Sequence, residues 1–255
     1  MEKIQLPKSW NDITVYQFQE LSLMNIEDYD SDIDIVLDQL AIITNYDADD
    51  EIYDYMDIDD LLNIMKNISW IKNEPPQNYT KEFKPYRIKE LVKLTLGEFI
   101  DLEVYFSDNY IKNLHLICAI LYKQYKIDEW SNEIEEPYIY NLKSRADKYL
   151  DVRIPMVWGV IKAYLDFKEI ILDKYHVVFN NEGDELEDTT GLSEEEIIEI
   201  NKEIEEDKKK AKWSWPALIN NLAEGDITKY DAITNQPLIL VLNELAMRKA
   251  LKLNE

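Results

Sequence analysis

The chain has 255 residues, with 28 Lys or Arg against 52 Asp or Glu and a formal net charge of -24. Its five isolated glycines match neither Gly-rich nucleotide-binding fingerprint, and its single cysteine, Cys118, excludes an intramolecular disulfide framework and multi-cysteine zinc sites. The start, MEKIQLPKSW, lacks the apolar core of a secretory signal, and no stretch is apolar enough to span a membrane. The composition therefore disfavours nucleotide-dependent enzymes and predicts a soluble protein that stays in the cytoplasm.

The first third of the chain is acidic and is predicted to be helical. Residues 9–65 contain 16 acidic side chains and no Lys or Arg. Three amphipathic helices are expected here, each opened by a residue that can cap it. The capping residues are Thr14, with Gln17 completing a capping box, Ser31 or Asp32, and Asp57. Two prolines at 75 and 76 end this region, since neither can continue a helix.

The middle of the chain mixes short strands with apolar helices. From Tyr79 to Leu94 apolar residues alternate with Lys and Arg, which predicts a short β-hairpin near residues 80–94. Thr95 and Glu98 then form a second capping box. Two helices are expected after it, packed as an αα-hairpin in the core over residues 95–125.

A further helix is predicted from Pro155 to about Tyr175, because proline favours the first turn of a helix. This segment is nearly apolar all round, so we expect it to be central in the core. A tyrosine-rich connector at residues 138–140 and a short helical stretch over residues 141–150 precede it.

The C-terminal quarter is predicted to form a separate helical unit. Residues 180–192 have no apolar periodicity and read as an acidic linker. A charged helix is expected from Ser193, followed by a short helix over residues 216–222 and a longer one after Pro237. The predicted fold class is mainly α, a helical bundle, with a main domain at 1–179, a linker at 180–192 and a C-terminal unit at 193–255.

No catalytic or metal-binding constellation stands out, and no cofactor is predicted. His115 and Cys118 lie in an apolar helical stretch, which favours structural roles in the core, and His176 follows a predicted helix end. The run Asp28 to Asp32 resembles half of a calcium loop. It lacks the glycine at position 6 and the bidentate acid at position 12 that an EF-hand needs, because Ile33 and Gln39 stand there.

The charge indicates which partners the chain attracts. A strongly acidic surface repels nucleic-acid phosphates and favours basic protein segments, so no direct nucleic-acid binding is expected. Two tryptophans beside Pro216 are typical of interface anchors, or of a hydrophobic staple onto the main domain, and an apolar stripe follows Pro237. The predicted partner-binding residues are Trp213, Trp215, Leu238, Val241 and Leu242.

Two stretches resemble proteins of phages that infect Bacteroidetes. The opening IQLPKSWNDITVYQFQEL is similar to the starts of tail-assembly and virion-associated proteins. The ending WPALINNLAEGDITKYDAITNQPLILVLNELAMRKALK is similar to helical C-terminal units of phage tail-assembly chaperones. The resemblance implies a non-enzymatic assembly role in the host cytoplasm or the virion, with phage structural proteins that carry a basic or amphipathic segment as partners.

Two other classes of function remain open at this point. An acidic decoy that mimics DNA would place its charges between Asp28 and Asp60 and would lose affinity steeply with added salt. A hydrolase or nuclease would use clustered acids and a metal, and magnesium would then stabilise its fold. The sequence leaves the identity of the partner and the oligomeric state open.

Overall fold

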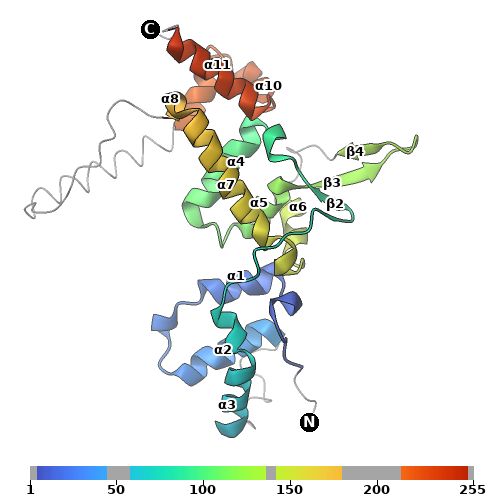
Figure 1. Cartoon of the computed structure of the whole chain (residues 1–255), viewed down its shortest axis with the longest axis vertical. Helices are drawn as coiled ribbons and strands as arrows, with labels where there is room; N and C mark the ends of the chain where they lie inside the picture. Colours follow the sequence, from blue (N-terminus) through green and yellow to red (C-terminus); the bar gives the residue numbers. More distant parts are fainter. Residues whose placement is uncertain (1–4, 45–57, 136–141, 180–213, 252–255) are drawn as a thin grey trace, which may run out of the picture. The chain divides into compact units, whose positions relative to one another are not determined.

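The computed structural model describes residues 5–44, 58–135, 142–179 and 214–251. In these residues the protein is mainly helical with a small antiparallel sheet, which confirms the predicted fold class (Figure 1). The predicted connector at 138–140, the linker at 180–192 and the charged helix from Ser193 lie outside the described residues. None of the described helices is both long and apolar enough to cross a membrane.

The chain separates into two compact units, and neither is one continuous segment. Unit 1 comprises Met1–Lys89 and Leu102–Phe167, and unit 2 comprises Glu90–Asp101 and Lys168–Glu255. This grouping differs from the predicted boundaries at 180 and 193. Residues 90–101 and 168–179 of the predicted main domain group with the C-terminal residues in unit 2. Unit 2 is therefore larger than the predicted C-terminal unit.

Unit 1 begins with three helices that pack in sequence order. α1 and α2 contact each other, and so do α2 and α3 (Figure 1). The capping box predicted at Thr14 is present and opens α1. The helices that lie in unit 1 are α1 (Val15–Leu23), α2 (Asp32–Thr44), α3 (Ile58–Asn67), α5 (Leu114–Leu121) and α6 (Leu142–Ala146).

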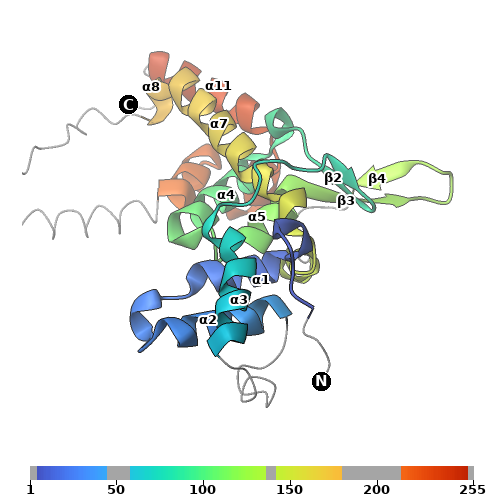
Figure 2. The same cartoon turned by 60° about the horizontal axis from the view of Figure 1, so that its bottom comes forward.

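The sheet of unit 1 has four antiparallel strands in the order β1-β2-β3-β4. β1 (Glu82–Phe83) and β2 (Tyr86–Ile88) form the predicted hairpin, paired through Phe83 and Tyr86. β3 (Tyr122–Ile127) pairs with β2 and with β4 (Glu133–Glu135). Figure 2 shows the β3–β4 hairpin extending away from α1 and α5.

The αα-hairpin predicted over 95–125 is corrected at its C-terminal end. α4 (Leu96–Asn109) and α5 are both present, but α5 ends at Leu121. Tyr122 has extended backbone angles and pairs with Ile88 as the first residue of β3. Pairing with β2 therefore overrides the helical spacing that runs through this stretch.

The core of unit 1 surrounds α5, whose residues Leu114, Ile117 and Leu121 are fully buried. Beside it, the Tyr149 hydroxyl donates to the carbonyl oxygen of Tyr122 at 3.1 Å. Four rings from the sheet and from the turn after α6 make contact here, with centroids 4.9 to 6.4 Å apart. They belong to Phe83, Tyr86, Tyr122 and Tyr149.

The helix predicted from Pro155 begins slightly later than expected. Pro155 lies in a single 3-10 turn (Ile154–Met156), and α7 runs from Trp158 to Lys174. The helix is not buried all round, because Lys162, Leu165 and Ile170 are exposed. This exposed strip corrects the expectation of a fully central helix.

Unit 2 is built around α11 (Leu238–Ala250), with α8 (His176–Phe179), α10 (Tyr230–Thr234) and a helical stretch over residues 214–222. The start of α11 is tied to the residues that open α4. The Leu238 backbone N–H donates to the Leu94 carbonyl at 2.8 Å, and the Leu96 N–H donates to the Gln236 carbonyl at 2.9 Å. α11 also packs against α8.

Candidate functional site

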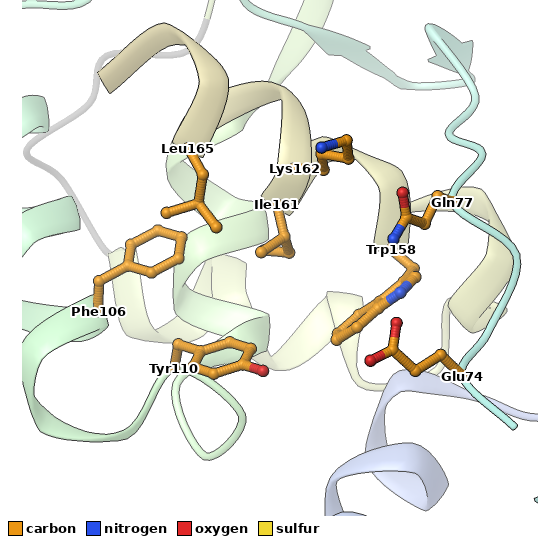
Figure 3. Close-up of a pocket in the computed structure, with 8 residues that line it drawn as sticks. All are labelled: Glu74, Gln77, Phe106, Tyr110, Trp158, Ile161, Lys162 and Leu165. Atoms are coloured by element: carbon orange, nitrogen blue, oxygen red, sulfur yellow. The ribbon is translucent and has the colours of Figure 1, made fainter. Parts of the chain in front are cut away.

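An apolar groove in unit 1 is a concave surface with a distinct chemical character. Its volume is about 470 Å³. We call it the Trp158 groove, and Figure 3 shows its lining. The lining residues are Glu74, Gln77, Phe106, Tyr110, Trp158, Ile161, Lys162 and Leu165.

The first turns of α7 form the base of the groove. Trp158, Ile161 and Leu165 recur at helical spacing, so their side chains share one face of α7. Trp158 and Ile161 are only 9 % and 5 % exposed, whereas Leu165 is 45 % exposed. The groove therefore has a firmly packed floor and a rim that faces solvent.

A chain of aromatic rings supports Trp158 from the N-terminal side. Its ring contacts that of Phe18 edge-on, with centroids 4.8 Å apart, and Phe18 contacts Trp10 in the same way at 5.5 Å. Trp10 in turn meets Trp70 at 5.1 Å. Edge-to-face packing of this kind fixes the orientation of each ring, so the position of Trp158 is well determined.

Stacked aromatic rings form one wall. Phe106 stacks on Tyr164 with centroids 5.0 Å apart and on Tyr110 at 6.1 Å. The Tyr164 hydroxyl donates to Glu103 at 2.9 Å, and burial raises the pKa of Tyr164 well above its usual value. Because the phenol stays protonated, this hydrogen bond holds the wall in place across the whole neutral range.

The opposite wall is the extended segment that carries Glu74 and Gln77. Its backbone is held at three points along its length. The Trp10 indole N–H donates to the Asn73 carbonyl at 2.9 Å, the Gly159 N–H to the Asn78 carbonyl at 2.8 Å, and the Thr80 N–H to the Met156 carbonyl at 2.8 Å. The buried Pro75 adds rigidity, since its ring fixes one backbone dihedral.

A second, smaller cavity of about 280 Å³ adjoins the groove. The two share Glu74, Tyr110 and Trp158, and the second continues past Trp10 to Leu21 on α1. Together they form an elongated surface, which is apolar in the groove and mixed in the second cavity, where Ser22, Lys72 and Asn73 also line it. This shape suits a peptide segment better than a compact small molecule.

Few charges border the groove. Glu74 and Lys162 are exposed at its edge (Figure 3), and Lys162 lies 3.4 Å from Asp166 in an exposed ion pair. Exposed pairs of this kind contribute little to stability. Apolar contact, rather than charge, is therefore the main attraction that the groove offers.

The residues predicted from the sequence as partner contacts lie elsewhere, in unit 2. Leu238, Val241 and Leu242 are 1 %, 6 % and 1 % exposed, so they pack in the interior. Trp215 contacts Phe99 edge-on with centroids 5.7 Å apart. Trp213 lies outside the described residues. A partner contact at these five residues stays a prediction.

Cys118, the candidate nucleophile, is packed in the core, and the two histidines, the candidate bases, lie close to polar groups of the fold. Cys118 is fully buried, and burial raises the pKa of its thiol. His115 is half-buried, and its Nδ1 lies 3.2 Å from the side-chain amide of Gln19. Burial lowers the pKa of His115, and the charge of Asp147 opposes this effect. Exposed His176 has its Nδ1 3.0 Å from the carbonyl oxygen of Asp173.

The acidic residues do not gather into a metal site in the part of the chain that the structure describes. In the run that resembles half of a calcium loop, two side chains, those of Tyr29 and Ser31, have other contacts. Ser31 donates to Asp34 at 2.7 Å, and the neighbouring Tyr29 donates to Asp38 at 2.7 Å. The acidic cluster at residues 47–54 lies outside the described residues.

Compared with protein-family models, with curated proteins and with solved structures, the chain has no match. The groove itself is therefore the principal guide to function.

Sequence reasoning missed the groove although part of its signal is visible. Phe106 and Tyr110 are four residues apart, and Trp158, Ile161 and Leu165 follow the same helical spacing. This pattern predicts an apolar helix face. It does not tell whether another element covers that face, because covering depends on contacts between residues far apart in the chain.

Proposed function

We propose that the protein is a non-enzymatic phage assembly protein, a tail-assembly chaperone or minor virion component, which holds a segment of a structural protein in the Trp158 groove. The observation that carries the proposal is an open apolar groove with aromatic walls, which the described residues of the chain leave unfilled. The resemblance of both ends of the chain to phage assembly proteins supports the same role.

The chemistry of the groove suggests the kind of segment that it binds. Its apolar base favours an amphipathic segment that inserts aliphatic or aromatic side chains against Trp158. The net charge of -24 attracts basic segments over a longer range and raises their rate of encounter. A partner segment with apolar anchors and flanking Lys or Arg satisfies both conditions.

The proposal is tested by co-expressing the protein with the tail and head-tail proteins encoded beside its own gene. We expect one of them to be captured, and Leu165→Glu to weaken that complex at least about tenfold, because a charge at the rim opposes apolar burial. Ile227→Ala is the control, since Ile227 is 75 % exposed and belongs to unit 2, whereas the groove is formed by residues of unit 1. Capture that is unaffected by Leu165→Glu would contradict the proposal.

The same complex separates this role from that of an acidic DNA mimic. Exposed acids do occur at the start of α2, at Asp30, Asp32 and Asp34. A complex held by these charges would weaken steeply with added salt, whereas one held by the groove should persist. Persistence in high salt is the expected result.

A further inference from the structure

Three residues line both the Trp158 groove and the smaller cavity that adjoins it. They are Glu74, Tyr110 and Trp158, so they surround the junction at which the two cavities meet. In Figure 3 the Glu74 carboxylate points toward the Trp158 indole, and the Tyr110 hydroxyl points into the same space. One carboxylate and two aromatic side chains therefore come together at one point of the surface.

The Glu74 carboxylate brings an uncompensated charge to this junction. It is exposed, and it makes neither an ion pair nor a hydrogen bond with any residue that the structure describes. The other charged residue of the groove, Lys162, lies 3.4 Å from Asp166, whose charge offsets it. Lys72 lines only the smaller cavity, and no ion pair joins it to Glu74. The groove side of the junction is therefore negative and favours a cation.

The aromatic side chains of the junction are also suited to a cation. Among the described residues, Tyr110 is the outermost of three stacked rings. Its plane lies 14° from that of Phe106, with centroids 6.1 Å apart, and Phe106 stacks in turn on Tyr164. Tyr110 is 40 % exposed, so the stack reaches the surface. Tyr and Trp rings attract cations to their faces, because the π electrons there carry partial negative charge.

Of the two basic side chains, arginine suits this arrangement better than lysine. The guanidinium is planar, so it can lie on the Tyr110 ring and continue the stack, and it can donate two parallel hydrogen bonds to a carboxylate such as Glu74. The lysine ammonium is compact and strongly hydrated, and it offers no plane for stacking. The aliphatic part of an arginine side chain would contact Trp158.

We propose that the junction of the two cavities is an arginine-binding subsite, in which the guanidinium of a partner segment stacks on Tyr110 and pairs with Glu74. The inference rests on the proposed function for the source of that segment, and it names the side chain that the groove selects. Apolar residues on either side of the arginine would occupy the groove and the smaller cavity. One ion pair at a defined position fixes the register of the bound segment, while the apolar contacts persist in high salt.

The test uses a peptide of known sequence, so it does not depend on the natural partner. The probe is acetyl-Ser-Leu-Arg-Phe-Ser-amide, and its matched control carries citrulline, which keeps the shape of arginine without the charge. Binding to the full chain is followed by the NMR signal of the Trp158 indole N–H, assigned with Trp158→Phe. We expect the arginine peptide to bind at least about fivefold more tightly than the citrulline peptide, and more tightly than a lysine peptide.

Glu74→Gln should weaken binding of the arginine peptide at least about fivefold and leave binding of the citrulline peptide nearly unchanged, because it removes only a charge. Glu129→Gln is the matched control. Glu129 is also exposed and also belongs to unit 1, but it lies in the turn between β3 and β4. This variant loses the same net charge, so it measures long-range attraction alone and should bind the arginine peptide nearly as the native chain does. Both positions are exposed, so both variants should fold.

The inference is overturned if the arginine peptide does not bind, if the citrulline or lysine peptide binds as tightly, or if Glu74→Gln weakens binding no more than Glu129→Gln. Its failure is distinguishable from that of the proposed function. Partner capture that depends on Leu165 but not on Glu74 would overturn the arginine subsite and leave the assembly role in place. Peptide binding that depends on Glu74, without capture of any tail or head-tail protein, would support the subsite and contradict the assembly role.

Discussion

Gly159 shows how a single missing side chain shapes the Trp158 groove. A Cβ atom at this position would lie 2.6 Å from the carbonyl carbon and oxygen of Asn78 and 2.8 Å from the Gln77 carbonyl oxygen. These are backbone atoms, which cannot move aside as the end of a flexible side chain can. The wall that carries Glu74 and Gln77 therefore approaches α7 only because residue 159 is glycine.

Gly159→Ala is expected to lower the free energy of unfolding by about 1 to 3 kcal/mol, through overpacking against this segment. In an exposed helix a glycine-to-alanine change would raise the free energy of unfolding by about 1 kcal/mol. A decrease at residue 159 would therefore point to overpacking by its sign alone. Urea denaturation measures the effect. Gly97→Ala is the matched control, since its nearest neighbour is the Thr234 side chain at 3.2 Å, and it should cost less. Equal costs for the two variants would count against this account.

At this scale the sequence predicted which side chains are buried. Cys118 was expected in the core and is fully buried, because an apolar stripe marks a packed helix face. Leu238 and Leu242 are buried as well, and the partner contact predicted for them stays a prediction. Apolar periodicity identifies a face that is to be covered, but not whether the same chain or a partner covers it.

Among the elements, the helix starts were the most predictable features. At α1, Thr14 accepts from the Gln17 N–H at 3.2 Å, and the Gln17 side chain accepts from the Thr14 N–H at 3.0 Å. At α4, Thr95 and Glu98 make the same pair of bonds at 3.2 and 2.9 Å. These contacts are local, so four consecutive residues are enough to specify them.

Replacing either capping threonine with alanine is expected to destabilise the protein by about 1 kcal/mol, since a helical N–H loses its acceptor. Thr14→Ser and Thr95→Ser keep the hydroxyl and should stay close to the native stability. Chemical denaturation of the four variants tests this. A serine variant as unstable as its alanine counterpart would show that the methyl group, rather than the hydrogen bond, matters.

The ends of elements were less predictable than their starts. α5 passes directly into β3 at Tyr122, where the predicted helix continued to residue 125. The pairing of Tyr122 with Ile88 and of Gln124 with Tyr86 fixes the change, and each pair joins residues more than thirty positions apart. Local spacing contains no information about such a partner, so the third strand was missed. The fourth strand pairs only with the third, and it was missed together with it.

For the molecule as a whole, the sequence gives the acidic composition directly. How stability depends on pH follows instead from the surroundings of individual titratable side chains. Burial lowers the pKa of His115, so the folded chain resists taking up a proton there. Hydrogen bonds lower the pKa values of Asp128, Glu133 and Asp226, so folding favours their charged forms. Both kinds of shift make the folded state less stable in acid.

Thermal stability is expected to fall in two stages as the pH is lowered. The first begins below the ordinary histidine pKa of 6.5, because the unfolded chain then protonates His115 more readily than the folded chain does. The second begins below the ordinary carboxyl values of 3.8 and 4.5, where the three acids lose their charge-dependent bonds. His115→Gln should remove the first stage and retain the second, as followed by melting temperature against pH. A first stage that persists in this variant would exclude His115 as its source.

The path of the chain through the two units limits where the protein can be truncated and where its gene can recombine without splitting a unit. It passes between them after Lys89, after Asp101 and after Phe167, and the last two crossings fall inside α4 and α7. No single cut in the gene therefore separates the two units, because any fragment that contains all of one unit also carries part of the other. Truncation after residue 179 would leave α8 without α11. Recombination at any one point would split at least one of the two units, so both stay whole only when they are exchanged together.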